Sequence, residues 1–545
     1  MSRRQAFLET LLIFAIFCLQ GAWPVPEVNE PYYLGKAIHF WNPHWAAGDL
    51  FLPTPDTHKL FYFLCGWPSL WLGPQALAWT LRLLIWALQA WSWRRLAAAV
   101  VPRPWLSVLT AALLLFLLQH FNVAGEWVVG GAEAKGFAFV LMFLGLESLV
   151  QGRWSRTWLL LGGAAAFHVL VGGWAVAAAG IVAIAEGGLM YPAHSVCRFF
   201  RRHTECAGYI LALLGGFALS LIGLIPSLRL DWGADPAVVR RAHEIYVFQR
   251  FDHHLDAWRF FSDGVIVPFA LMGLAWFLLW PTASAEPGLR RLRGFVNAAI
   301  GIMLVGFAIR LLGVYHRDAA ASLLRFYWFR LADVAVPMGV TLLAVAWIAR
   351  RDLRVARAAL VGLALFHLAD CAVLRLFADP PFAERNVDGV AWRSALLWLT
   401  GDADPPIFPR QARADRLPDS PAWREACDWI ATSDRIPPDA RFLIPRAAQT
   451  FKWYAQRGEV ANWKETPQDA ASMVQWWERN QDIYATGNAP PLDRYFNFLA
   501  DRGADRLRQL GIKYEADYLI TQTSLPMLDL PIVHRNNSYV IYQLR

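Results

Sequence analysis

The chain has little charge and little cysteine. Only 17% of its 545 residues are Asp, Glu, Lys or Arg, whereas 56% are hydrophobic, and this composition excludes an ordinary soluble protein. Its six cysteines are scattered along the chain, which excludes a disulfide framework. The sequence also has no P-loop, no dinucleotide-binding fingerprint and no serine-hydrolase elbow. A nucleotide cofactor is therefore not expected.

What the sequence does have is long apolar runs. They recur from Leu11 to about Phe377, and many approach the ~20 residues that a helix needs to cross a bilayer. The 28 tryptophans are typical of a protein with two water–lipid boundaries to anchor. Arginines between the runs account for the net charge of +8. The basic charge is thus explained by orientation in a membrane, and no nucleic acid partner is expected.

The basic clusters predict a topology, because loops rich in Lys and Arg stay cytoplasmic. Arg3 and Arg4 place the N-terminus inside, so the loop 24–58 lies outside. The later clusters then predict about eleven transmembrane helices in residues 1–378. For the basic clusters to fall in every second loop, the stretch 157–187 must cross the membrane twice, with a glycine turn at residues 168–173 near the outer surface. We expect an inner (cytoplasmic) membrane protein with its C-terminus outside.

After Phe377 the composition changes. Residues 379–420 are rich in Pro, Asp and Arg and are interpreted as a linker, with one interfacial helix at 388–399. Residues 421–545 should form a soluble domain in which helices alternate with short strands. Its predicted helices are 421–432, 467–481 and 492–510, and its predicted strands are 440–446, 516–522, 531–535 and 538–544. The predicted fold class is an α-helical polytopic membrane protein with a small C-terminal extracytoplasmic α/β domain.

The first outer loop, 24–58, is the strongest candidate for chemistry. Its carboxylates are Glu27, Glu30, Asp49 and Asp56. Glu30, in Asn-Glu-Pro-Tyr-Tyr, could act as a general base or hold a metal in a partly dry pocket. Asp49 and Asp56 are further catalytic candidates, with Tyr32 and His58 beside them for binding substrate. Alternatively, Glu30 is an acid on a solvated loop, and the two aspartates cap interfacial helices.

A second outer loop, 125–136, carries Glu126, Glu133 and Lys135 among glycines that allow a ligand to approach the backbone. These side chains could bind substrate, or they could form a juxtamembrane salt bridge. His168, at the tip of the expected hairpin, could face the acidic loops as a ligand or proton carrier. Otherwise it is a polar plug bonded to the backbone of the turn.

The outer loop 227–262 groups Arg240, Arg250, His253 and His254. Arginine offers a bidentate fork to phosphate, so this loop could clamp a phosphate or pyrophosphate. The alternative is an amphipathic helix that meets anionic headgroups. Arg330, at the outer start of a span, could likewise meet a lipid phosphate or simply pair with Asp333 three residues on.

The tail offers a weaker candidate. Residues 454–457 and 462–464 place polar and aromatic groups together, as a binding patch would. Several tail tryptophans could stack on a sugar, although more of them are expected in the core of the domain.

With these motifs, the chain resembles the GT-C superfamily of integral-membrane glycosyltransferases. That group includes protein mannosyltransferases, aminoarabinose lipid A transferases and oligosaccharyltransferase catalytic subunits. The similarity covers about residues 1–378 and rests on NEPYY just past the first span, on GGAEAKG and on FHVLVGGW. More narrowly, the chain is similar to uncharacterised bacterial membrane proteins sharing HFWNPHWAAGDLFL, FHVLVGGW and FYWFRLADV.

The resemblance implies a polyprenyl-phosphate- or pyrophosphate-linked sugar as donor and inverting transfer at the outer face to a lipid, glycan or protein acceptor. It would make Glu30 the base or metal-binding acid, and the loop 227–262 the segment that closes over the donor. The superfamily more often has Asp, or Asp-Glu, where this chain has Asn29-Glu30, which leaves a divalent cation open.

Two other classes compete with a glycosyltransferase. A lipid or polysaccharide transporter would need a polar path through the spans, but the ionisable residues cluster at the outer face, and no internal repeat is visible. A non-catalytic membrane scaffold of the same fold, in contact with membrane lipids and with partners on its tail, is the third reading.

Overall fold

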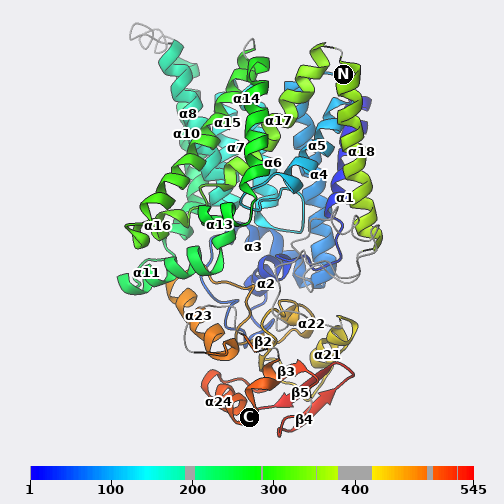
Figure 1. Cartoon of the computed structure of the whole chain (residues 1–545), viewed down its shortest axis with the longest axis vertical. Helices are drawn as coiled ribbons and strands as arrows, with labels where there is room; N and C mark the ends of the chain where they lie inside the picture. The colour runs from blue at the N-terminus through cyan, green and yellow to red at the C-terminus, as the bar shows by residue number, and fades with distance from the viewer. Residues whose placement is uncertain are drawn as a thin grey trace.

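A computed structural model describes residues 2–190, 203–283, 286–351, 353–377, 420–487, 495–496, 498–524 and 526–545. Long helices lie side by side as a bundle, and a small domain with a β-sheet sits at one end of it (Figure 1). The N-terminus lies at the far end of the bundle from this domain. The predicted architecture, a helical polytopic part followed by a small α/β domain, is confirmed.

The first part of the chain is helical throughout. Proline at the first helical position begins several helices, among them α4 and α15, where its missing N–H costs nothing. The helices are α1 (Arg3–Gly21), α2 (Glu30–Trp41), α3 (Lys59–Gly66), η1 (Trp67–Leu70), α4 (Pro74–Val100), α5 (Leu106–His120), α6 (Ala134–Val150), α7 (Trp154–Phe167), α8 (Val169–Met190), α10 (His203–Leu228), α11 (Pro236–Glu244), the π-helix η2 (Ile245–Arg250), α12 (Asp252–Leu255), α13 (Ala257–Ser262), α14 (Ile266–Leu279), η3 (Trp280–Ala283), α15 (Pro287–Leu312), α16 (Arg317–Leu324), α17 (Arg330–Arg351) and α18 (Arg354–Phe377).

Several of these helices suit a bilayer. Among the described residues, six helices are long and apolar enough to cross a membrane, namely α1, α8, α10, α15, α17 and α18. α5 and α14 are shorter apolar helices. α17 is the centre of the bundle, since it is buried over most of its length and contacts α5, α14 and α15. The predicted number of about eleven spans stays a prediction.

The hairpin expected within 157–187 is present, but glycine does not make its turn. α7 and α8 are separated by His168 alone, whose extended backbone (φ −148°, ψ 101°) interrupts the helix. Gly172 and Gly173 lie inside α8 instead. A Cβ on Gly172 would overlap the backbone of Ala165 on α7. Glycine is therefore used at this position for close helix packing rather than for the turn.

The C-terminal domain is a mixed sheet between helices. Its elements are α21 (Ser420–Thr432), β1 (Arg441–Leu443), α22 (Phe451–Ala455), β2 (Gly458–Glu459), α23 (Ala470–Tyr484), η5 (Leu499–Arg502), α24 (Ala504–Tyr514), β3 (Tyr518–Gln522), β4 (Ile532–Arg535) and β5 (Tyr539–Gln543). The strand order is β2-β1-β3-β5-β4, with β1 parallel to β2 and β3, and β5 antiparallel to β3 and β4.

Alternation along the strands explains the two faces of this sheet. Ile520 and Ile541 pack with α21 and α22, whereas Leu519 and Tyr542 pack with α24.

All four predicted strands and the helix at 421–432 are confirmed, and the helix predicted at 467–481 is α23. The helix predicted at 492–510 is wrong, because η5 and α24 are separated by Gly503 at φ +78°. The interfacial helix at 388–399 and nearly all of the linker 379–420 lie outside the described residues.

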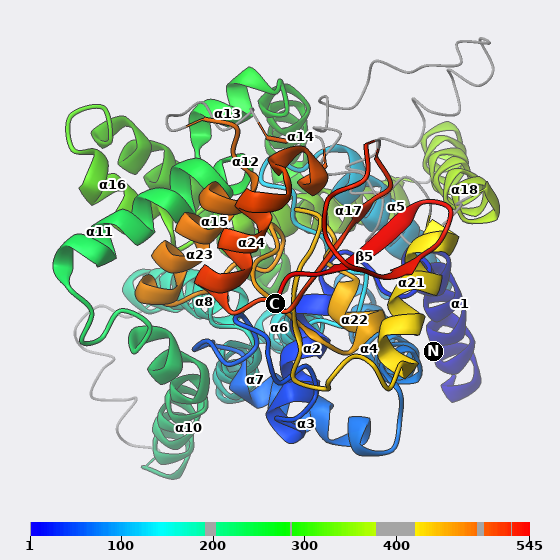
Figure 2. The ribbon, with the colours of Figure 1, turned by 90° about the horizontal axis from the view of Figure 1, so that it is seen from below.

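The domain is docked on the bundle over a broad surface. α22 packs against α2 and β2 bonds to the first outer loop, while α23 packs against α11 and η2. Seen from below, the domain covers the middle of the bundle end (Figure 2). The outer loops are thus enclosed between the bundle and the C-terminal domain.

Candidate functional site

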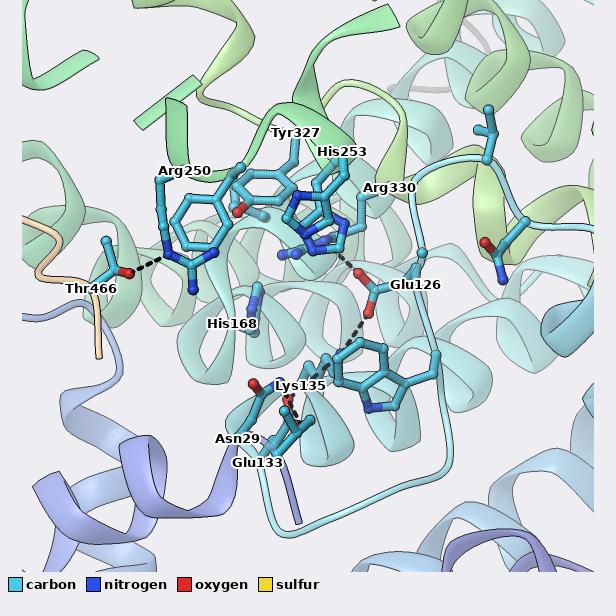
Figure 3. Close-up of a pocket in the computed structure, with 18 of the residues that line it drawn as sticks. Asn29, Glu126, Glu133, Lys135, His168, Arg250, His253, Tyr327, Arg330 and Thr466 are labelled. Carbon is cyan, nitrogen blue, oxygen red and sulfur yellow. Dashed lines mark hydrogen bonds and ion pairs between the residues drawn. The ribbon is translucent and has the colours of Figure 1, made fainter. Parts of the chain in front are cut away.

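A cavity of about 1380 Å³ lies where the bundle, its outer loops and the C-terminal domain meet. Figure 3 shows residues from all three parts turned toward it. Of the residues predicted to form a site, those that line this cavity are Tyr32, His58, Glu126, Glu133, Lys135, His168, Arg250, His253, His254 and Arg330. The structure therefore brings the three predicted loop clusters together in one place.

Four predicted residues do not line the cavity. They are Glu30, Asp49, Asp56 and Arg240. Arg240 is exposed on α11, whereas the three carboxylates are buried. Their catalytic assignment stays a prediction, and their geometry favours a structural role.

Glu30 is fully engaged in a buried ion pair. Arg82 Nε lies 2.6 Å from Glu30 Oε1, and Arg82 Nη2 lies 2.7 Å from Oε2. The backbone N–H groups of Ala132 and Glu27 also donate to this carboxylate, each at 2.8 Å. Both side chains are fully buried. Glu30 thus ties the first outer loop to α4 and to the second loop, and each of its oxygens already accepts two hydrogen bonds.

Asp56 and Asp49 hold the first outer loop in shape. Asp56 accepts from Tyr32 Oη at 2.7 Å and lies 2.9 Å from His58 Nδ1. Although burial raises the pKa of Asp56, Lys36, His58 and Tyr32 together hold it well below its usual value. Asp49 lies 2.9 Å from Lys452 Nζ of the C-terminal domain. These two carboxylates therefore orient neighbours of the cavity without reaching it.

Glu126 connects the second loop to the cations of the cavity. Lys135 Nζ lies 3.0 Å from Glu126 Oε1, and Arg330 Nε lies 2.6 Å from Oε2 (Figure 3). Lys135 also lies 3.6 Å from Glu133, which accepts from Asn29 Nδ2 at 3.1 Å. The salt bridge expected in this loop is present, and it faces the cavity. The alternative pair of Arg330 with Asp333 is wrong, because Asp333 accepts from the backbone of Val123 and Ala124.

The histidines enter the cavity from different elements. His168 lies between α7 and α8, with its ring centre 5.1 Å from that of His58. Its Nδ1 accepts from the backbone of Val171 at 3.3 Å. Burial, helped by His58, lowers the pKa of His168 well below its usual value. His168 is therefore both a cap of the helix break and a neutral cavity residue, so both of its expected roles have a structural basis.

Glu27 was among the loop carboxylates but was not singled out from the sequence. It lines the cavity and is buried, and its Oε2 has no hydrogen-bond partner among the described residues. Burial raises the pKa of Glu27 to about 8, with Arg82 acting against the rise and Glu30 and Glu133 adding to it. A desolvated carboxyl whose pKa lies near neutrality is what general base catalysis requires.

The Gly130-Gly131 pair makes room for this carboxylate. A Cβ on Gly131 would overlap Glu27 Oε2 and lie 3.0 Å from Glu30 Oε1. Gly131→Ala should therefore displace the Glu27 carboxylate and destabilise the protein by about 1–3 kcal/mol. Thermal unfolding in detergent measures the loss. The matched control is Gly173→Ala, since nothing lies within 4 Å of a Cβ there; an equal loss in both variants would contradict this explanation.

Arg250 is a buried cation in the wall of the cavity. It is buried at the end of the π-helix η2, and no acidic side chain among the described residues pairs with it. Its Nε donates to Thr466 Oγ1 at 3.0 Å and to the carbonyl oxygen of Trp463 at 3.2 Å. Burial lowers the pKa of Arg250 to about 10, so the side chain is still cationic at neutral pH. A buried arginine without a carboxylate indicates an anionic ligand.

Among the residues that the structure describes, no group of three or more His, Cys, Asp or Glu side chains is arranged to hold a metal ion. Glu30, the predicted metal-binding acid, is saturated by Arg82.

Comparison with known proteins gives a family for part of the tail and a set of distant structures. Residues 421–483 match a domain of unknown function, DUF6798. No curated protein matches the chain. ArnT from Cupriavidus metallidurans, bound to undecaprenyl phosphate, is similar with a TM-score of 0.44 and 15% identity, over 99% of this chain and 97% of that one.

The oligosaccharyltransferase AglB from Archaeoglobus fulgidus, in complex with an inhibitory peptide and a dolichol-phosphate, has a TM-score of 0.40 and 11% identity, over 94% of this chain and 69% of that one. A structure of the A. fulgidus oligosaccharyltransferase with Zn and sulfate has a TM-score of 0.42 and 15% identity, over 95% of this chain and 67% of that one.

Proposed function

We propose that this protein is a membrane glycosyltransferase that moves a sugar from a polyprenyl-phosphate or pyrophosphate donor to a lipid, glycan or protein acceptor at the outer face of the membrane. One observation carries the proposal. The same cavity is lined by a buried arginine that has no carboxylate partner among the described residues, by a carboxylate with one oxygen that none of them hydrogen-bonds, and by apolar side chains of the bundle. These are the three parts that a lipid-phosphate sugar needs.

Arg250 is assigned to the donor phosphate. Its Nε is used by Thr466 and Trp463, which leaves the two terminal nitrogens for phosphate oxygens in a bidentate arrangement. Arg330 and Lys135 are already paired with Glu126. They therefore add positive charge to the cavity, whereas Arg250 supplies the guanidinium that binds the phosphate. Figure 3 shows Arg250 and Arg330 on the same side of the cavity.

Apolar side chains at the rim suit the polyprenyl chain. Val267, Leu271 and Phe366 line the cavity and are also more than half exposed, at 60%, 58% and 55%. In a membrane, such side chains on α14 and α18 face lipid. A carrier lipid could thus lie between these helices while its phosphate reaches Arg250.

Glu27 is assigned to the base. Its carboxylate takes the proton from an acceptor hydroxyl as that oxygen attacks the anomeric carbon. The new glycosidic C–O bond forms as the bond between the anomeric carbon and the phosphate oxygen breaks, and the polyprenyl phosphate leaves with that electron pair. Attack opposite to the leaving group inverts the anomeric carbon. No step requires a metal ion.

The arrangement of the chain supports the expected topology, with the two ends on opposite sides of the membrane. The N-terminus and the C-terminal domain lie at opposite ends of the bundle (Figure 1). The basic Arg3 and Arg4 would keep the first end cytoplasmic, which would place the cavity and the C-terminal domain, residues 421–545, outside.

The proposal is tested with the full chain in nanodiscs and a panel of polyprenyl-phosphate sugars. We expect the wild type to consume a donor, and Arg250→Gln to weaken binding of undecaprenyl phosphate by roughly 10-fold to 100-fold, because a hydrogen-bonded charge is lost. Arg240→Gln, which changes an exposed arginine of the same loop, is the matched control. Binding without consumption would favour a transporter, and no binding by the wild type would favour a scaffold.

A further inference from the structure

The C-terminal domain supplies one wall of the cavity. Lys464, Glu465, Thr466 and Gln468 all line it, and they lie inside the segment that matches DUF6798. We infer that this domain is part of the donor site and that Thr466 is a positioning residue for Arg250. The inference rests on the proposed function, since it gives Arg250 its phosphate.

The contact between Arg250 and the domain has a defined geometry. Thr466 Oγ1 and the Trp463 carbonyl oxygen both accept from Nε, the one guanidinium nitrogen that lies within the side-chain stem. The guanidinium lies 4.4 Å from the Phe251 ring centre and 5.2 Å from that of Trp463. The acceptors and the two rings together fix the plane of the fork. Figure 3 shows Thr466 reaching Arg250 from its own side of the cavity.

The segment that carries Thr466 is itself held firmly. Trp463 donates its backbone N–H to the Arg446 carbonyl at 2.8 Å and stacks on Trp476. At the other end, Gln468 accepts from Thr57 Oγ1 at 2.9 Å and donates to Tyr32 Oη at 3.0 Å. The segment 463–468, which contacts Arg250, is therefore fixed by bonds both to the rest of the domain and to the first outer loop.

The helix that carries Arg250 is joined to the same unit. Ala242 of α11 and Ile245 of η2 form a buried cluster with Met473 and Trp476 of α23. A π-helix such as η2 departs from regular hydrogen bonding, and such segments are frequent at functional sites. The loop 227–262 and the C-terminal domain thus fix the position of Arg250 together. A change in either of them should move the guanidinium group that binds the phosphate.

The experiment compares Thr466→Val with Thr466→Ser in the full chain. Valine removes the acceptor at nearly constant volume, so we expect the Kd for undecaprenyl phosphate and the KM for the donor to rise roughly 10-fold, with kcat nearly unchanged. Serine keeps the acceptor and should restore both values. Thr450→Val is the matched control, because it takes the acceptor from Trp423 Nε1 in the same domain without lining the cavity.

A double-mutant cycle separates positioning from stability. Arg250→Lys keeps the charge but has no Nε–H, so adding Thr466→Val to it should change binding no further. Wild-type affinity in Thr466→Val, or equal losses in Thr466→Val and Thr450→Val, would overturn the inference while the proposed function stands. Failure of the wild type to bind undecaprenyl phosphate would overturn both.

Discussion

Glu27→Gln is expected to slow sugar transfer by about 10²-fold to 10⁴-fold, the usual worth of a general base, while the protein folds as the wild type. Glutamine keeps the shape of the side chain but cannot take a proton. Donor binding should stay within about 2-fold of wild type, because Arg250 and not Glu27 holds the phosphate in the proposed mechanism. Single-turnover transfer from a polyprenyl-phosphate sugar in nanodiscs measures the effect.

The pH dependence follows from the same carboxyl. Its pKa is raised to about 8 by burial, and only the ionised form is a base, so kcat/KM should rise with pH up to about 8 and then level off. The free energy of unfolding should change with pH in the opposite direction. Because the native state holds this proton between the usual pKa of a glutamic acid and about 8, stability falls as pH rises through that window. Glu27→Gln should abolish the pH dependence of kcat/KM and remove this carboxyl's contribution to the pH dependence of stability.

Glu30→Gln is the control for this result, and it should behave differently. Glu30 is paired with Arg82 at 2.6 Å, with both side chains fully buried. Removing one partner leaves an uncompensated buried charge and should cost about 3–5 kcal/mol. A Glu30→Gln protein that folds normally but has lost transfer, beside an active Glu27→Gln protein, would return the role of base to Glu30.

The helical membrane part and the tail domain could be predicted from sequence because their signals are local. Apolar length marks α8, α10 and α15, and alternation marks β3 and β5. β2 was missed because its two residues, Gly458 and Glu459, carry no period. The glycine turn was placed wrongly because Gly172 lies in close contact with α7. Such a contact between two helices cannot be predicted from the local sequence of one of them.

The site was predicted as a set of loops but not in its internal pairing. Glu30 and Arg82 are 52 positions apart, and nothing local says which carboxylate an arginine will meet. One signal could have found the pair. Arg82 is the only charged residue of α4 before Arg94, and a charge in such an apolar stretch needs a buried partner. Glu27, the carboxylate left over, then becomes the candidate base. Thr466 was beyond reach, because residues 462–464 indicated a binding patch without indicating its partner in loop 227–262.

The second large effect is expected at Lys452, which joins the C-terminal domain to the first outer loop. Lys452 is fully buried and lies 2.9 Å from Asp49 and 3.4 Å from Glu459, with Glu465 in direct contact. Lys452→Met would leave three carboxylates buried without their cation. We expect a loss of about 3–5 kcal/mol, together with faster proteolysis of the loop 24–58 in the folded protein.

The size of this loss should depend on pH. Burial raises the pKa of Glu465 to about 7 and that of Glu459 well above its usual value, although Lys452 opposes both shifts. Without the lysine, the cluster can be tolerated only with more protons bound, so the loss should be larger at pH 8 than at pH 6. Thermal unfolding of the full chain at the two pH values measures this difference.

Lys513→Met provides the matched comparison for Lys452. Lys513 pairs with Asp482 at 2.7 Å, but its side chain is 57% exposed, and an exposed pair is worth less than about 1 kcal/mol. If Lys452→Met were no more destabilising than Lys513→Met, the buried cluster would not hold the domain against the loop. The C-terminal wall of the cavity would then need another anchor, and the contact of Gln468 with Tyr32 and Thr57 would be the next one to remove.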